Sequence, residues 1–260
     1  MEHYEFTPND ADVRVEKTER PISTPKKATF NMAKVYLWMA LGLLITGLVS
    51  IGLPELFIAL IQNESLSAET ANAVYRVLLV VSILAMVPSM IIISVQALRK
   101  NFVLDVISYI VYTVAMGVLL GVVFVGFVEP GEGLWTIGIP FLVTAVCFAG
   151  MGLIGSLMKD STVGVIIPVI STLAIGCFTI YMINSFIGSA IVYWIVDFIL
   201  FGLMLLTVAI DTKSVKDVAE SIGFTNNTNL AIYCAYMLYV EFIWIFLRVL
   251  LYTMMFSRRK

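Results

Sequence analysis

The sequence has few charged residues, and this shortage already excludes most soluble proteins. Only 13% of its 260 residues are charged, whereas about 25% is usual for a soluble domain. Hydrophobic residues make up 60%, which is more than a soluble core of this size would bury. The composition therefore indicates a polytopic membrane protein. The formal net charge is −2, so we expect no nucleic-acid partner.

Histidine and cysteine are also scarce. The single histidine is His3, which excludes Ser-His-Asp and Cys-His catalysis and histidine-based zinc sites. Three cysteines (Cys147, Cys177 and Cys234) lie apart in apolar stretches and form no metal-binding spacing. We interpret them as packing residues, and we expect neither enzymatic activity nor a cofactor.

Seven apolar stretches follow a polar leading segment, and each is close to the length of about 20 residues that spans a bilayer. Lipid offers the backbone no hydrogen-bond partners, so each stretch should be helical. The fold class predicted is all-α, a polytopic membrane protein, with a disordered tail over residues 1–34 and a transmembrane domain over 35–257. Pro54 and the polar segment 211–228 are expected to form joints. The stretches are 35–53, 73–98, 103–128, 133–158, 163–188, 189–210 and 229–256.

Lysine and arginine occur at alternate joints between these stretches, which predicts the orientation of the chain. Six lie in the leading segment, and the joints that carry basic residues have Arg99 and Lys100, Lys159, and Lys213 and Lys216. The intervening joints carry glutamates instead. This pattern places the N-terminus in the cytoplasm. Seven spans would put the basic residues 258–260 on the other side, so the side of the C-terminus stays open.

Acidic residues at membrane depth are costly and usually face protein or a water-filled path. Asp211 closes the sixth stretch, and Glu241 lies in the middle of the last. Asp197 precedes Asp211 by fourteen residues, so both share one helix face about 21 Å apart. Arg248 follows Glu241 by seven residues, about 10.5 Å along the axis, so each should meet another helix. These residues are candidates for an ion or proton pathway, or for structural pairing.

Two further charged residues, Asp105 and Arg76, lie near the ends of their stretches. We therefore expect both at the membrane interface rather than in the interior. Small residues, including Gly117, Gly121 and the group Gly150, Gly152 and Gly155, indicate close helix packing.

Several segments together resemble the Bax inhibitor-1 family, also called the transmembrane Bax-inhibitor-motif family. The resemblance runs from about residue 30 to 256 and rests on the order and spacing of the segments. They are residues 35–48 in the first stretch, Met158-Lys159-Asp160-Ser161, Asp211-Thr212-Lys213, Glu241-Phe242-Ile243 and Leu247-Arg248-Val249-Leu250.

The resemblance implies a seven-helix transmembrane bundle with the last helix central and a pH-sensitive calcium leak. It implies that Asp211 and Glu241 form the carboxylate pair that senses protons and binds the cation. It also implies a basic latch after the second helix, here Arg99 or Lys100. Two departures stand out: the family usually has aspartate at the position of Glu241, and Asp197 is an additional acid.

Two carboxylates held close together in a partly dry site do not both ionise easily, so they titrate as a pair. Calcium needs six to eight oxygens, of which two carboxylates supply at most four. The expected metal site at Asp211 and Glu241 is therefore weak, as permeation requires. The direction of the pH effect, the ion's identity and the oligomeric state stay open.

Three other function classes compete with a leak channel. Inverted internal repeats would favour a secondary transporter of a small solute, and none is evident in the sequence. An intramembrane aspartyl protease is disfavoured because Asp197 and Asp211 lack Tyr-Asp and Gly-x-Gly-Asp contexts. A regulatory membrane protein acting through a protein partner stays open. The expected location is a bacterial plasma membrane, with the eukaryotic reticulum or Golgi as the alternative.

Overall fold

The described residues of the chain form seven long helices. The structure, a computed structural model, describes residues 32–63, 67–99, 101–127, 135–221 and 228–257. All seven helices are long and apolar enough to cross a membrane, which confirms the predicted all-helical seven-span fold. Their bounds are α1 Met32–Gln62, α2 Ala68–Arg99, α3 Phe102–Phe127, α4 Trp135–Leu157, α5 Asp160–Ile187, α6 Ala190–Ser221 and α7 Thr228–Ser257.

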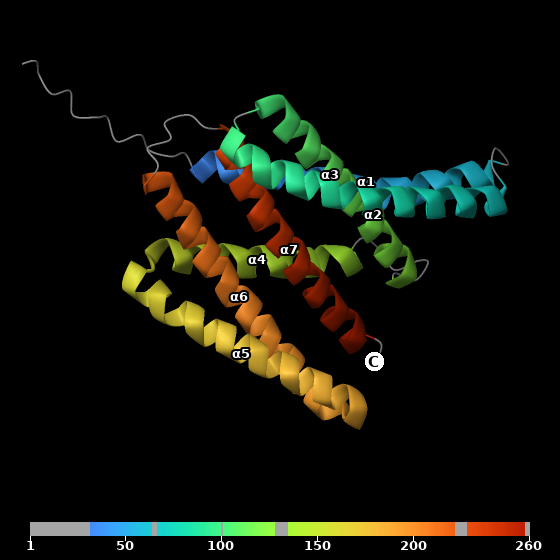
Figure 1. Cartoon of the computed structure of the whole chain (residues 1–260). Coiled ribbons are helices and arrows are strands. Elements are labelled where there is room, and N and C mark those ends of the chain that lie inside the picture. The colour runs from blue at the N-terminus through green and yellow to red at the C-terminus, as the bar shows by residue number, and fades with distance from the viewer. Residues whose placement is uncertain (1–31, 64–66, 100, 128–134, 222–227, 258–260) are drawn as a thin grey trace, which may run out of the picture.

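The helices form two groups that meet across α7 (Figure 1). Helices α1, α2 and α3 form one group, in which α3 packs on both α1 and α2, and α4, α5 and α6 form the other, in which α6 packs on both α4 and α5. Helix α7 contacts α1, α2, α3, α4 and α6, whereas α5 lies at the periphery against α6. In its most apolar stretch 67% of the α7 residues are buried, against 6% for α5. The last helix is therefore central, as the family resemblance implies.

Successive helices run in opposite directions, so the helix ends gather at two ends of the bundle. The odd-numbered helices begin, and the even-numbered helices end, at what we call the near end, toward the left of Figure 1. The opposite end is the far end.

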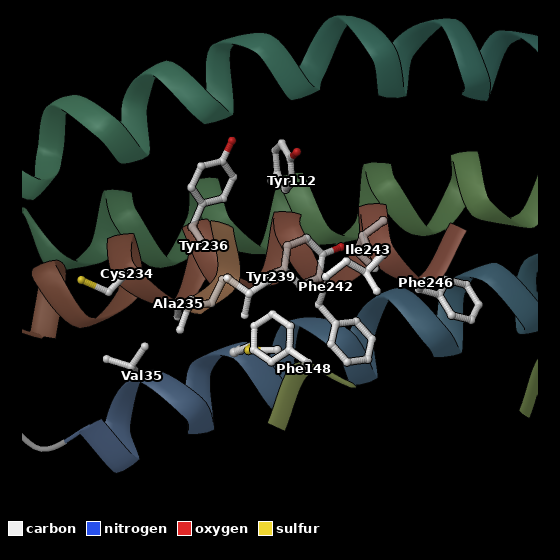
Figure 2. Packing of buried hydrophobic residues seen from close by; sticks show 14 of the residues in the cluster. Val35, Tyr112, Phe148, Cys234, Ala235, Tyr236, Tyr239, Phe242, Ile243 and Phe246 are labelled. Atoms are coloured by element: carbon white, nitrogen blue, oxygen red, sulfur yellow. The ribbon is translucent and has the colours of Figure 1, made fainter. Parts of the chain in front are cut away.

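Helix α7 is apolar on nearly every side, which suits a helix surrounded by protein. Buried hydroxyls fix its position against α1 and α3. The Thr46 hydroxyl donates to the carbonyl of Thr113 at 2.9 Å and lies 2.6 Å from the Tyr239 hydroxyl. Since Thr46 has already given its one proton, Tyr239 donates to Thr46. Figure 2 shows Tyr112 and Tyr236 close together, with ring centroids 4.9 Å apart.

Glycines allow two helix pairs to approach at backbone distance. A Cβ atom added at Gly155 of α4 would lie 2.1 Å from the carbonyl oxygen of Ala209 in α6. At Gly117 of α3 it would lie 3.0 Å from the carbonyl oxygen of Thr46 in α1. A Cβ atom at Gly150 would meet nothing within 4 Å. The packing role predicted for Gly117 and Gly155 is confirmed, and the prediction for Gly150 is wrong.

Two helices are longer than expected. Pro54 was expected in a joint, but it lies inside α1, which continues to Gln62. Proline removes one backbone hydrogen bond, and in lipid the rest of the backbone still has no better partners than its own helix. Helix α6 continues ten residues beyond Asp211 to Ser221, so the predicted joint at 211–228 is helical over its first half. An ion pair between Lys213 and Asp217, one turn apart, supports this extension.

The turn between α5 and α6 is short and well defined. Gly188 adopts the left-handed conformation with φ 71°, which glycine accepts without strain. Its N–H donates to the Asn184 carbonyl at 2.7 Å, and the Asn184 side chain bonds both the N–H and the carbonyl of Ser189. This turn defines the boundary that the continuous apolar sequence leaves vague. Residues 1–31 of the predicted tail lie outside the described residues, and α1 includes the remaining three.

The Gly155 contact gives the first testable prediction. Gly155→Val should force α4 and α6 apart, because the added side chain meets backbone that cannot rotate away. We expect a loss of about 1–3 kcal/mol in stability, as for other overpacked sites, measured as a lower Tm of the purified protein in detergent. Gly150→Val on the same helix is the matched control, since its side chain enters open space. Equal melting temperatures for the two variants would contradict this account of the packing.

Candidate functional site

Asp211 and Glu241 lie opposite each other on α6 and α7. Their carboxyl groups are close enough to interact with each other. Two carboxyl groups this close repel each other when both are ionised. Both residues are half-buried, and Glu241 Oε2 is buried without a hydrogen-bond partner among the described residues.

The two carboxyl groups lie at different distances from the ends of their helices. Glu241 is the fourteenth residue of α7, about 20 Å from its start. Asp211 is ten residues, or about 15 Å, from the end of α6. The apolar stretch alone suggests that Asp211 closes its helix, but the helix continues beyond it. Glu241 is therefore far from both ends of α7, whereas Asp211 lies two residues before Lys213, where the polar last part of α6 begins.

Asp197, Arg248 and Tyr252 form a second polar contact between the same two helices, which we call the Asp197 cluster. One oxygen of Asp197 pairs with the Arg248 guanidinium. The other accepts a hydrogen bond of 2.6 Å from the Tyr252 hydroxyl. The Tyr252 ring stacks on Phe198, with centroids 5.1 Å apart. The cluster lies near the start of α6 and the end of α7, so it ties these helices at the far end.

The contacts within the Asp197 cluster indicate structural roles for Arg248 and Asp197. Arg248 meets an acid of the neighbouring helix and not Glu241 of its own, as their axial separation requires. Asp197 faces α7, as Asp211 does, but both its oxygens are occupied by protein partners. In this arrangement Asp197 is a structural acid rather than a free step in an ion path.

The two residues expected to form the latch lie at the end of α2 and directly after it. Arg99 is the last residue of α2, at the near end of the bundle, and its side chain is outside the described part of the structure. Lys100 lies outside the described residues altogether. The latch therefore stays a prediction.

A further acid, Asp105, lies in the first turn of α3, near the helix end as expected, and is enclosed by protein. Its exposed fraction is 1%, and neither carboxylate oxygen has a hydrogen-bond partner within the described part of the chain. The sequence does carry a signal for this. Asp105 precedes the buried Tyr109 and Tyr112 by four and seven residues, which is the spacing of one helix face.

Lysines join the ends of α4, α5 and α6 at the near end. Lys213 pairs with Asp160 at 2.8 Å and with Asp217 at 2.5 Å. Lys216 donates to the Ser156 carbonyl at 3.2 Å. Asp160 is 87% exposed, so these contacts are solvated and each contributes little stability on its own. They position the end of α6 that follows Asp211.

The described residues contain no group of three or more histidine, cysteine, aspartate or glutamate side chains placed to hold a metal. Asp211 and Glu241 provide at most four carboxylate oxygens. A calcium ion there would need water or backbone carbonyls for its remaining ligands.

The Asp197 cluster gives a second prediction. Arg248→Met should leave the Asp197 carboxylate buried without its cation, at a cost of about 3–5 kcal/mol. Asp197→Asn combined with Arg248→Met removes both charges and should recover much of that loss. The measurement is a double-mutant cycle of thermal unfolding in detergent. Additive effects of the two substitutions would show that the pair has no energetic coupling.

Comparison with known proteins agrees with this fold. Residues 30–258 match the family model described as Inhibitor of apoptosis-promoting Bax1. The Inner membrane protein YbhL of Escherichia coli strain K12 is 27% identical over 222 residues, covering 84% of this chain and 88% of the relative. The protein of the same name from E. coli O6:H1 strain CFT073 gives the same identity and coverage. No solved structure matches the chain significantly.

The family match covers nearly the whole membrane domain, and the relative that shares this coverage is an inner membrane protein. The chain is therefore an integral membrane protein that belongs to the family of inhibitors of apoptosis-promoting Bax1, the Bax inhibitor-1 family.

Proposed function

We propose that this protein is a pH-sensitive, calcium-permeable leak channel in which Asp211 and Glu241 are both the proton sensor and the cation site. The observation that carries the proposal is the proximity of two half-buried carboxyl groups, one on α6 and one on α7. A carboxyl pair placed there has no evident structural purpose, because it leaves Glu241 Oε2 buried without a partner among the described residues.

The pair responds to pH through the charge that appears when its proton leaves. Two unit charges 4 Å apart repel by about 4 kcal/mol at an effective dielectric constant of about 20. That repulsion is relieved when α6 and α7 move apart or when a cation binds between the two groups. Either response couples release of the proton to opening of the space between α6 and α7 or to cation binding there. Because the Asp197 cluster joins α6 and α7 at the far end, the movement would concentrate at the near end.

The proposal includes further parts that rest on the sequence and the family. Arg99 or Lys100 acts as the latch by donating a charge-assisted hydrogen bond to the ionised carboxyl pair. Calcium is the transported ion, and the protein performs no enzymatic reaction and holds no cofactor. Its surroundings are the lipid bilayer, without a nucleic-acid partner. A bacterial plasma membrane with a cytoplasmic N-terminus is supported by the inner-membrane relative and by the lysine and arginine distribution.

A second candidate is regulation of another membrane protein through direct contact. The family's description, which names an inhibitor of a pro-apoptotic protein, favours it. Co-purification of a stoichiometric partner from the native membrane would support this function.

The leak is tested by calcium flux into liposomes that hold the purified protein, measured across about pH 5 to 8, the range in which a coupled carboxyl pair can titrate. We expect flux to vary with pH in the wild type. Asp211→Asn and Glu241→Gln should each make it independent of pH, because a single remaining acid no longer shares a proton across the two helices.

Two matched controls separate the pair from a general effect of charge. Glu55→Gln and Glu69→Gln each remove one carboxylate charge at an exposed position, and both should retain the pH response of the wild type. Absence of flux at every pH from folded wild-type protein would reject the leak function. A pH response that persists in both pair variants would reject the sensor.

A further inference from the structure

An apolar pocket of about 220 Å³ lies between α1, α3, α4 and α7, away from the carboxyl pair. Its floor includes buried side chains of α3 and α7, among them Leu120, Phe242 and Phe246. Figure 2 shows Phe242 and Phe246 on the side of α7 that faces α1. The pocket is therefore built into the junction between the two helix groups.

The pocket opens sideways, toward the position of lipid. Its rim includes Ile51 of α1, which is 38% exposed, and Phe141 of α4, which is 44% exposed. Over their described residues α1 and α4 barely touch, since each packs instead on α7 and on its own group. The gap between α1 and α4 thus leads from the outer surface of a membrane-spanning bundle to α7.

Water is a poor occupant for this space. The lining is almost wholly apolar, and its two hydroxyl groups already have partners. Thr46 bonds Thr113 and Tyr239, and Ser50 donates to the Gly47 carbonyl. A buried water needs two to four polar partners, which the pocket does not offer. It is therefore dry.

We propose that this pocket binds one acyl chain of a membrane phospholipid, which enters between α1 and α4. Protein interiors rarely leave voids larger than a water molecule, because the lining atoms then lose their dispersion contacts. A cavity of about 150 Å³ lined by Leu, Ile and Phe already takes up benzene, and this one is larger. At this depth acyl chains are the abundant apolar species, and the opening faces them.

Photochemical labelling tests the proposal directly. The purified protein is placed in vesicles of phosphatidylethanolamine and phosphatidylglycerol that contain a trace of phospholipid with a diazirine at the end of one acyl chain. After irradiation, adducts are mapped by mass spectrometry. We expect labels on the floor residues Leu120, Phe242 and Phe246, whose burial keeps them from bulk lipid. Leu153, 67% exposed on α4, should be labelled by bulk lipid and reports on insertion.

Two variants block the pocket without disturbing the helices. Gly47 and Gly138 belong to its wall, and a Cβ atom at either meets nothing within 4 Å. Gly47→Leu and Gly138→Leu should each lose the floor labels and keep the Leu153 label. Gly176→Leu on α5, also in open space, is the control and should keep both.

Wild-type protein labelled at Leu153 but not at the floor would overturn the proposal. Floor labels that persist in the combined Gly47→Leu and Gly138→Leu variant would also overturn it. Neither result depends on ion flux, so the outcome is independent of the proposed leak.

Discussion

Most of this structure depends on the packing of α7 between two groups of helices. In lipid each helix satisfies its own backbone hydrogen bonds, so helices associate only through side chains and close backbone contacts. The contacts within each group are extensive, but the groups meet mainly across α7. A single helix therefore holds the bundle together, and its position determines how the two halves fit.

The polar contacts that distinguish this chain are concentrated on that helix. Tyr239 bonds Thr46 of α1, Glu241 faces Asp211 of α6, and Arg248 pairs with Asp197 of α6. These contacts differ in what they permit. The hydroxyl bond and the Asp197 cluster have complementary partners and resist movement, whereas the carboxyl pair is compatible with close contact only while it shares a proton. On the proposed function, the near half of the α6–α7 interface is therefore the part that responds to pH.

The number of spans, their helical state and the depth of Glu241 could be predicted from the sequence, because length and hydropathy are the physical causes. The local breakers misled. Pro54 and the polar residues after Asp211 mark joints in soluble proteins, but a membrane helix has no competing hydrogen-bond partner and continues through them. Asp105 was placed by its distance from the end of its stretch, although its spacing from Tyr109 and Tyr112 indicates the buried face. No pattern in the sequence indicates the gap between α1 and α4, because the gap arises from the way the two helix groups pack against α7.

The carboxyl pair and the pocket lie on different sides of the same stretch of α7. Phe242 and Ile243, which line the pocket, directly follow Glu241, and successive helical residues point about 100° apart. Repulsion within an ionised pair would push α7 away from α6, toward the α1 side and the pocket. On the two proposals together, an acyl chain in the pocket opposes that displacement because a filled site is hard to compress. Proton release and lipid occupancy would then act on α7 in opposite directions, which makes the bilayer itself a determinant of the pH response.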